Sequence, residues 1–174
     1  MSIAARSRPY KENRFSGMYI NKPPPHSKNL RKGRYSSENQ IYLLTTVTEQ
    51  RRLVFTDFAL ARELVHALHF QETQQRVESL AFVIMPDHLH WLFALRADYS
   101  LATVMHSVKS YSAQKIQKAS SFKKGRLWQP GYHDHALRKE EDVVQVARYI
   151  IANPLRASLV ERVGDYPLWD AVWL

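Results

Sequence analysis

Two apolar runs joined by a single Pro-Asp pair lie near the middle of the sequence. Residues 78–85 (ESLAFVIM) and 88–95 (HLHWLFAL) consist mostly of aliphatic and aromatic side chains. Such runs favour β-strands, and the short Pro86-Asp87 connection makes the second strand return antiparallel to the first. In this interpretation Asp87 is a turn residue. The hairpin requires a fold built on an antiparallel sheet.

The segments around this hairpin alternate between strand patterns and helical spacing. In chain order we predict a strand at 40–48, a helix capped by Thr56 or Asp57, the hairpin, a helix capped by Ser100, a strand at 132–137 and a helix at 140–151. This order, β-α-β-β-α-β followed by a helix, predicts an α+β fold. We expect a ferredoxin-like antiparallel sheet of about four or five strands with helices packed on one face. The aromatic tail after Pro154 is expected to pack back on this domain.

The positive charge of the chain is concentrated in two segments. The net charge is +9, and residues 1–40 carry nine basic and two acidic side chains, while residues 109–126 carry six basic and no acidic ones. We therefore divide the chain into a basic, Pro-containing N-terminal arm (1–39) and one domain (40–174). Such a basic balance favours polyanions such as nucleic acid as partners. For the arm, a solvated tail without function stays open as an alternative.

Several classes of protein are excluded by composition. The chain has no cysteine, which rules out disulfides, cysteine nucleophiles, iron–sulfur clusters and cysteine zinc sites. It has no apolar run of about 18 residues, and its first residues lack the apolar stretch of a secretory signal. We expect a cytoplasmic protein that does not enter a membrane.

Two histidines at the start of the second hairpin strand form the first candidate site. Because side chains alternate along a strand, His88 and His90 lie on one face and can bind one metal ion together. Ordinary half-buried histidines are the alternative at this stage. A second pair with the same spacing, His133 and His135, shows that the spacing alone is not specific.

The last predicted helix carries a tyrosine and an asparagine four residues apart. Tyr149 and Asn153 therefore share one helical face. If that face points at the histidines, Asn153 can supply a third, oxygen ligand, and a nearby cation can stabilise the phenolate of Tyr149. The alternative is a core tyrosine and an asparagine that ends the helix before Pro154. Tyr111 lies on a predicted apolar helix face, where we expect it to be a core residue.

Three segments in this order resemble the REP-associated tyrosine transposases, a branch of the single-tyrosine HUH endonucleases related to small insertion-sequence transposases. They are MPDHLHWLF (85–93), LWQPGYHDHALR (127–138) and YIIANPLRASLV (149–160). The resemblance implies the HUH fold, a divalent cation (Mg²⁺ or Mn²⁺) on His88, His90 and Asn153, and Tyr149 as the nucleophile. The positions that match the middle signature, whose individual roles stay unassigned, are Trp128, Gln129, His135 and Arg138.

The resemblance implies a metal-dependent endonuclease and strand transferase that cuts single-stranded DNA beside REP-type hairpins. Cleavage would pass through a 5′-phosphotyrosine link. The basic side chains expected to bind DNA phosphates are Lys109, Lys115, Lys118, Lys123, Lys124, Arg126 and Arg138. The alternatives are a solvated helix face for these residues, and for the whole protein a non-catalytic module that binds structured nucleic acid. A nucleoid-associated monomer is expected, with a dimer as the alternative.

Overall fold

The computed structural model describes residues 40–120, 125–138 and 142–173. The basic arm predicted for residues 1–39 lies outside these ranges, and so do Lys123 and Lys124. Within the described ranges, no helix has the length and apolar character needed to span a bilayer.

A five-stranded sheet with the order β4-β1-β3-β2-β5 forms the centre of the molecule. All neighbouring strands run antiparallel. The strands are β1 (Ile41–Val47), β2 (Val77–Met85), β3 (His88–Leu95), β4 (His133–Ala136) and β5 (Trp169–Ala171). The predicted hairpin is β2-β3, and its register pairs Met85 with His88 across the turn. The α+β fold with an antiparallel ferredoxin-like sheet is confirmed.

Side-chain caps set where the longer helices begin. The helices are α2 (Phe58–Thr73), α3 (Leu101–Ala119), α4 (Val143–Ile151) and the one-turn α5 (Asn153–Arg156), with short 3₁₀ turns η1 (Glu49–Arg51), η2 (Val54–Thr56) and η3 (Val163–Asp165). Asp57 accepts hydrogen bonds from two backbone N–H groups of α2, and Ser100 accepts one from α3. The final helix begins at Val143 rather than at residue 140, because Asp142 caps it.

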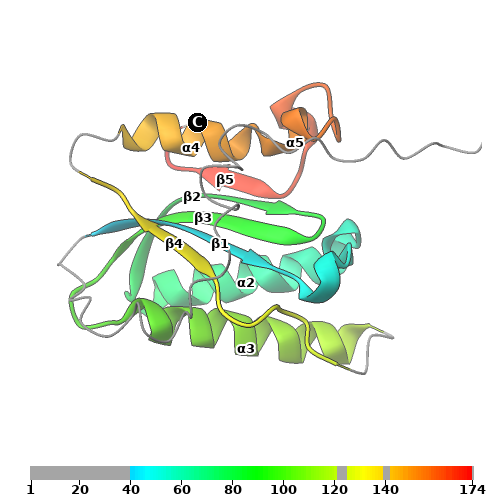
Figure 1. The fold of residues 1–174 in the computed structure, drawn as a ribbon, viewed down its shortest axis with the longest axis horizontal. Coiled ribbons are helices and arrows are strands. Elements are labelled where there is room, and N and C mark those ends of the chain that lie inside the picture. The colour runs from blue at the N-terminus through cyan, green and yellow to red at the C-terminus, as the bar shows by residue number, and fades with distance from the viewer. Residues whose placement is uncertain (1–39, 121–124, 139–141, 174) are drawn as a thin grey trace, which may run out of the picture.

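Helices cover both faces of the sheet (Figure 1). The expected packing on one face is correct for α2 and α3, whose apolar side chains meet Leu89 and Trp91 of β3. The expectation is wrong for α4, which packs on the opposite face against Val83 and Leu92. The physical reason is the hairpin itself: its strands are apolar on both sides, so each face needs a cover. The molecule therefore has three layers.

The C-terminal tail packs back on the sheet, as expected. Its strand β5 pairs with β2. Before it, Tyr166 donates a hydrogen bond from Oη to the Ile84 carbonyl over 2.7 Å. Burial raises the pKa of Tyr166 to about 12, so the phenol stays protonated and remains a donor at neutral pH.

Candidate active site

The two histidines of β3 lie side by side on the face of the sheet that α4 covers. Alternation along the strand puts His88 and His90 on the same side as Leu92, which belongs to the apolar cluster beneath α4. Their ring centroids are 4.8 Å apart and the rings are almost perpendicular, at 85°. His88 is buried, with 6% of its surface exposed, and His90 is half-buried. The predicted pair is therefore a real cluster of two imidazoles.

The ionised carboxylate of Asp87 contacts the Nδ1 atom of His88. Asp87 Oδ1 lies 2.5 Å from His88 Nδ1, and Asp87 Oδ2 lies 3.0 Å from Arg51 Nε. Burial alone would raise the pKa of Asp87, but the hydrogen bond with His88 and the charges of His88 and Arg51 outweigh it and lower that pKa. With Nδ1 engaged in this way, His88 presents Nε2 as its ligating atom. Asp87 is thus more than the turn residue that the sequence indicated.

His90 is oriented in a similar manner by a hydroxyl group. Its Nδ1 lies 2.8 Å from Thr45 Oγ1 on β1. Burial, followed by the charges of His88 and Arg156, holds the pKa of His90 well below its usual value. The ring is therefore neutral at pH 7. When Nδ1 shares its proton with Thr45, the lone pair lies on Nε2, where a metal ion can bind it.

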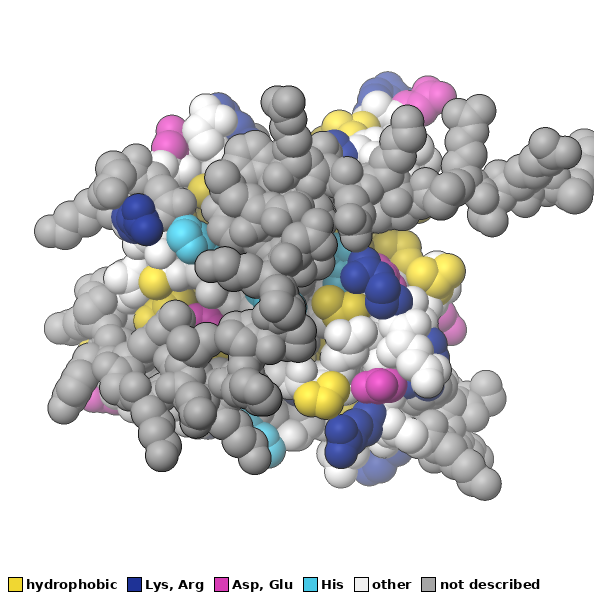
Figure 2. All heavy atoms as spheres, viewed as in Figure 1, with side chains coloured by type: hydrophobic (Ala, Val, Ile, Leu, Met, Phe, Trp, Pro, Cys, Tyr) yellow, Lys and Arg dark blue, Asp and Glu magenta, His cyan; other side chains and the backbone are white. Residues whose placement is uncertain are grey.

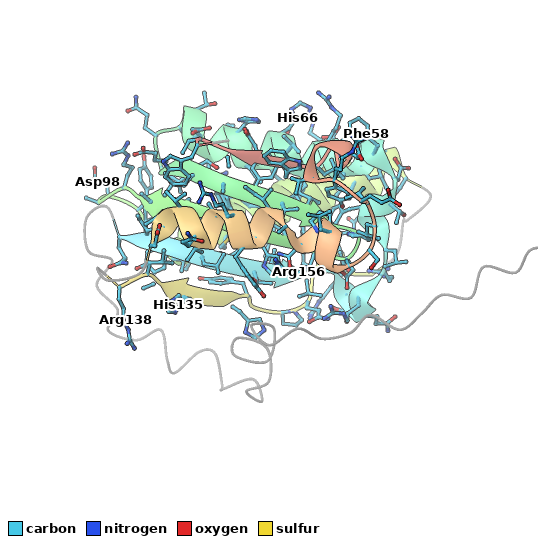
Figure 3. The ribbon with its side chains drawn as sticks, turned by 90° about the horizontal axis from the view of Figure 1, so that it is seen from above. Phe58, His66, Asp98, His135, Arg138 and Arg156 are labelled. Carbon is cyan, nitrogen blue, oxygen red and sulfur yellow. The ribbon has the colours of Figure 1, made fainter. Side chains whose placement is uncertain are left out.

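Tyr149 of α4 forms a connected group with Asn153 and Arg156 of α5. Figure 3 labels Arg156 in this group. The Arg156 guanidinium carbon lies 3.9 Å from the centre of the Tyr149 ring. Arg156 Nη2 donates to the Tyr149 carbonyl over 2.5 Å and to Asn153 Oδ1 over 2.7 Å. Asn153 Nδ2 donates to the Ile150 carbonyl over 2.8 Å. These bonds fix both the ring and the direction of the amide.

Arg156 was missed by the sequence analysis, although the sequence contains a signal for it. Residues at positions 149, 153 and 156 are spaced four and three apart, which is one stripe of a helix. The predicted site rests on the spacing of Tyr149 and Asn153 alone and therefore lacks Arg156. The structure shows that the third member of the stripe contacts the other two.

The described residues offer two imidazoles for a metal but no third ligand of the usual kinds. Among them, no three His, Cys, Asp or Glu side chains come together in a way that could hold a metal ion. A site built on His88 and His90 therefore needs a donor of another type, such as an amide or phosphate oxygen. Asn153 Oδ1 can be such a metal ligand. One of its two lone pairs accepts the hydrogen bond from Arg156, and the second lone pair is left for a metal ion.

The second histidine pair lies on the same sheet face, on β4, with β1 between it and β3. In the strand register Thr45 stands between His133 and His90. The backbones of these two histidines are thus separated by two strand spacings, about 10 Å. His133 is exposed and His135 is half-buried. The pair flanks the candidate site without joining it.

The signature segment 127–138 contains at least one residue with a structural role. Trp128 is buried, with 5% exposed, and its Nε1 donates to Ser112 Oγ of α3 over 3.0 Å. Its ring packs against Phe55 at 5.5 Å. The backbone N–H of Gln129 donates to the Val47 carbonyl. Trp128 therefore anchors the segment to the core. Arg138, by contrast, is exposed at the end of this segment (Figure 3).

The predicted basic residues do not form one equivalent set. Lys109 is half-buried, and its Nζ donates to the carbonyls of Gln129 and Gly131 over 2.7 and 2.6 Å. Its charge holds a loop in place. Lys118 and Arg126 are exposed, and Lys115 Nζ lies 5.4 Å from the centre of the Tyr111 ring. On the face shown in Figure 2, the described Lys and Arg side chains lie in separate groups rather than in one patch.

The sequence model of a family described as "Transposase IS200 like" matches residues 36–153. That range contains both histidines of β3 and ends at Asn153. The chain belongs to this family.

Two proteins similar to this chain are named REP-associated tyrosine transposases, the group that the sequence resembles. The REP-associated tyrosine transposase of Escherichia coli (strain K12) is 26% identical over 137 residues, which cover 77% of this chain and 78% of that protein. A solved structure of a REP-associated tyrosine transposase bound to a REP hairpin matches with a TM-score of 0.62 and 24% identity, over 78% of this chain and 79% of that one. The resemblance expected from the sequence is confirmed, and the solved structure confirms the fold.

Proposed function

We propose that this protein is a metal-dependent endonuclease and strand transferase that cuts single-stranded DNA beside a hairpin. One observation carries the proposal: α4, which carries Tyr149, packs on the sheet face that holds His88 and His90, where Tyr149 contacts the apolar cluster that contains Leu92. A tyrosine and a candidate metal site therefore share one side of the sheet. Similarity to the E. coli REP-associated tyrosine transposase supports the transposase part of this proposal.

Each residue of the site has a separate role in this proposal. His88 and His90 would hold a divalent cation, Mg²⁺ or Mn²⁺, through their Nε2 atoms, with Asn153 Oδ1 as a third ligand. When bound, such an ion withdraws charge from a phosphate oxygen and lowers the pKa of a nearby hydroxyl group. Asp87 and Thr45 keep the two imidazoles in the ligating orientation.

The reaction is a transesterification at phosphorus. Tyr149 gives its phenolic proton to solvent water, and its Oη forms a bond to the phosphorus of the scissile phosphodiester. The bond from phosphorus to the 3′-oxygen breaks, and that oxygen takes up a proton to become a free 3′-hydroxyl. The fragment whose 5′ end carries this phosphate stays attached to Tyr149 as a phosphotyrosine ester. Because one ester replaces another, rejoining needs no nucleotide cofactor.

The DNA substrate is proposed to be a hairpin with an adjoining single strand. The likeness to a structure that is described as bound to a REP hairpin supports this partner. The exposed side chains Lys118, Arg126 and Arg138 supply charges for phosphate contacts. Among the predicted basic residues, Lys109 is the least suited to bind a DNA phosphate, since its ammonium group already donates to two carbonyls. We propose a monomer as the active form.

The test is formation of a covalent protein–DNA adduct. The full-length protein is incubated with hairpin-bearing oligonucleotides and Mn²⁺, and the products are separated on a denaturing gel. We expect an adduct with the wild-type protein and none with Tyr149→Phe. Tyr111→Phe is the matched control, because Tyr111 stacks on Phe70 between α2 and α3, on the other side of the sheet. Hairpin binding without an adduct on any substrate would instead support a non-catalytic binding module.

A further inference from the structure

The segment that leads from β1 into α2 exposes two large apolar side chains. Leu53 and Phe58 have 62% and 49% of their surface exposed. Arg62, one helical turn after Phe58, places its guanidinium carbon 5.9 Å from the centre of the Phe58 ring. Phe55, which lies between the two, is only 2% exposed and packs against Trp128. The core is therefore within reach of this segment, and Leu53 and Phe58 stay outside it.

The backbone before these side chains has an unusual conformation that its surroundings fix. Gln50 and Arg51 have φ angles of 55° and 51°, in the left-handed region that residues other than glycine rarely adopt. Such a conformation costs free energy and persists only where neighbouring groups hold it. Here Thr48 Oγ1 donates to the Arg52 carbonyl over 2.7 Å, and Arg52 Nε donates to the Glu49 carbonyl over 3.0 Å. The side chains that follow this turn therefore have defined positions.

Two backbone hydrogen bonds tie the segment to the turn that precedes His88. The N–H of Thr48 donates to the Asp87 carbonyl, and the N–H of Phe55 donates to the Pro86 carbonyl, both over 2.9 Å. Since Pro86 is two residues from His88, the segment lies within about 10 Å of the His88 backbone. Figure 1 shows it, in cyan, at the end of the sheet where β2 turns into β3. A DNA strand held at His88 can reach this segment.

Two arginines add positive charge beside the apolar side chains. Arg62 and Arg126 are exposed, and neither forms an ion pair with another residue that the structure describes. Arg52 Nη2 donates to the Arg126 carbonyl, which brings the backbone of Arg126 to the same turn. The nearby carboxylate of Asp57 is engaged as the cap of α2. The surface thus combines exposed apolar groups with cations that have no carboxylate partner within the described ranges.

We propose that Leu53, Phe58 and Arg62 form a docking surface for the single-stranded DNA next to the cleaved bond. The inference rests on the proposed function and names where the single strand binds. Bases stack on aromatic rings and on guanidinium planes, and phosphates pair with arginines, so a single strand matches both parts of the surface. A duplex keeps its bases paired and stacked inside. The hairpin stem therefore offers no base to Phe58, and the surface selects the unpaired segment.

The first test compares two phenylalanines of the same helix. Phe70, near the end of α2, is 43% exposed, and the guanidinium carbon of Arg76 lies 5.7 Å from its ring centre, so it matches Phe58 in exposure and in its cation contact. Binding of a hairpin with a single-stranded tail is measured by fluorescence anisotropy in Tyr149→Phe protein, where no adduct forms. We expect about 5- to 30-fold weaker binding when Phe58→Ala is added and no change with Phe70→Ala. Equal effects of the two substitutions would overturn the proposal.

A hairpin without the tail separates the docking surface from a disturbed fold. We expect Phe58→Ala to bind this hairpin as tightly as its parent does. A loss of equal size with and without the tail would mean that the substitution acts on the fold or on hairpin binding, and the proposal would be wrong.

A second test uses salt and modified DNA. Arg62→Gln should lower the slope of log Kd against log salt for the tailed hairpin by about 0.7, the value for one phosphate contact of a single strand, while Phe58→Ala leaves the slope unchanged. Removing the base at one position of the tail should weaken binding to the parent protein and have no further effect in Phe58→Ala. Additive losses at every position would refute the stacking contact. If the wild-type protein forms no adduct, the proposed function fails, while these binding comparisons still decide on the docking surface.

Discussion

Replacing Asp87 by Asn tests whether the carboxylate behind His88 tunes a metal ligand. The substitution keeps the shape of the side chain and removes its charge. The backbone contacts of the turn do not depend on the side chain, since Thr48 donates from N and Oγ1 to the Asp87 carbonyl over 2.9 and 3.0 Å. The fold should therefore survive, and any effect should be confined to His88 and Arg51.

The size of the effect follows from the two contacts that the carboxylate makes. A charge-assisted hydrogen bond is about twice as strong as a neutral one, so the 2.5 Å contact to His88 Nδ1 should lose about 1 kcal/mol. The pair with Arg51 is half-exposed on the arginine side and adds at most about 1 kcal/mol. Only the loss at His88 acts directly on a metal ligand, and about 1 kcal/mol corresponds to about fivefold weaker binding of a metal ion. The pair with Arg51 is present with and without the metal, so its loss affects the stability of the fold.

The assay is a Mn²⁺ titration of wild-type and Asp87→Asn protein, followed by electron paramagnetic resonance and, in parallel, by adduct formation. We expect weaker Mn²⁺ binding and a rate defect that shrinks as Mn²⁺ is raised. Thermal unfolding of the metal-free proteins should differ little. An unchanged Mn²⁺ affinity would refute the role assigned to Asp87. A rate defect that Mn²⁺ does not relieve would place Asp87 in another step.

Three further predictions concern the framework around the site. Ser112→Ala leaves the buried Trp128 Nε1 without its acceptor, so chemical denaturation should show a loss of about 1–3 kcal/mol. Tyr166→Phe should lower the free energy of unfolding by about 1 kcal/mol at pH 7. The difference in stability between wild type and variant should narrow above pH 10. The phenol ionises in the unfolded chain before it does in the folded protein, where its pKa is about 12, so the wild type loses stability over this range. A difference that stays constant up to pH 12 would contradict this. Lys109→Met frees the carbonyls of Gln129 and Gly131, so hydrogen exchange over residues 125–138 should accelerate while the salt dependence of DNA binding stays the same; a shallower salt dependence would assign Lys109 to the DNA surface.

Local rules of sequence were sufficient for much of the fold. The hairpin followed from two apolar runs and a short turn. Ser100 was predicted to cap one helix and does so, and of the two predicted caps of α2, Thr56 and Asp57, the structure has Asp57. These features depend on a few neighbouring residues. The pairing of His88 with His90 depends only on alternation along one strand, and it was predicted for the same reason.

Features that depend on distant contacts were predicted poorly. The position of α4 on the opposite face was missed. The apolar side chains of α4 can pack on either face of the sheet, and its own sequence does not show which face α2 and α3 leave exposed. Lys109 looked like part of a basic surface, since its neighbours in the sequence do not reveal the carbonyls of residues 129 and 131. Asp87 looked like a turn residue, because its neighbours in the sequence do not reveal the contact of its carboxylate with Arg51. In each case the partner comes from another element.

The ribosome makes the histidines of the candidate site well before it makes Tyr149. The histidines belong to β3, in the middle of the chain, while Tyr149 lies on α4, which packs on β2 only after β4 has been made. A nascent chain on the ribosome therefore carries both imidazoles and no attacking hydroxyl over them. Under the proposed function, such an unfinished chain is harmless to DNA, and the capacity to cut appears only after α4 has been made and has packed on the sheet.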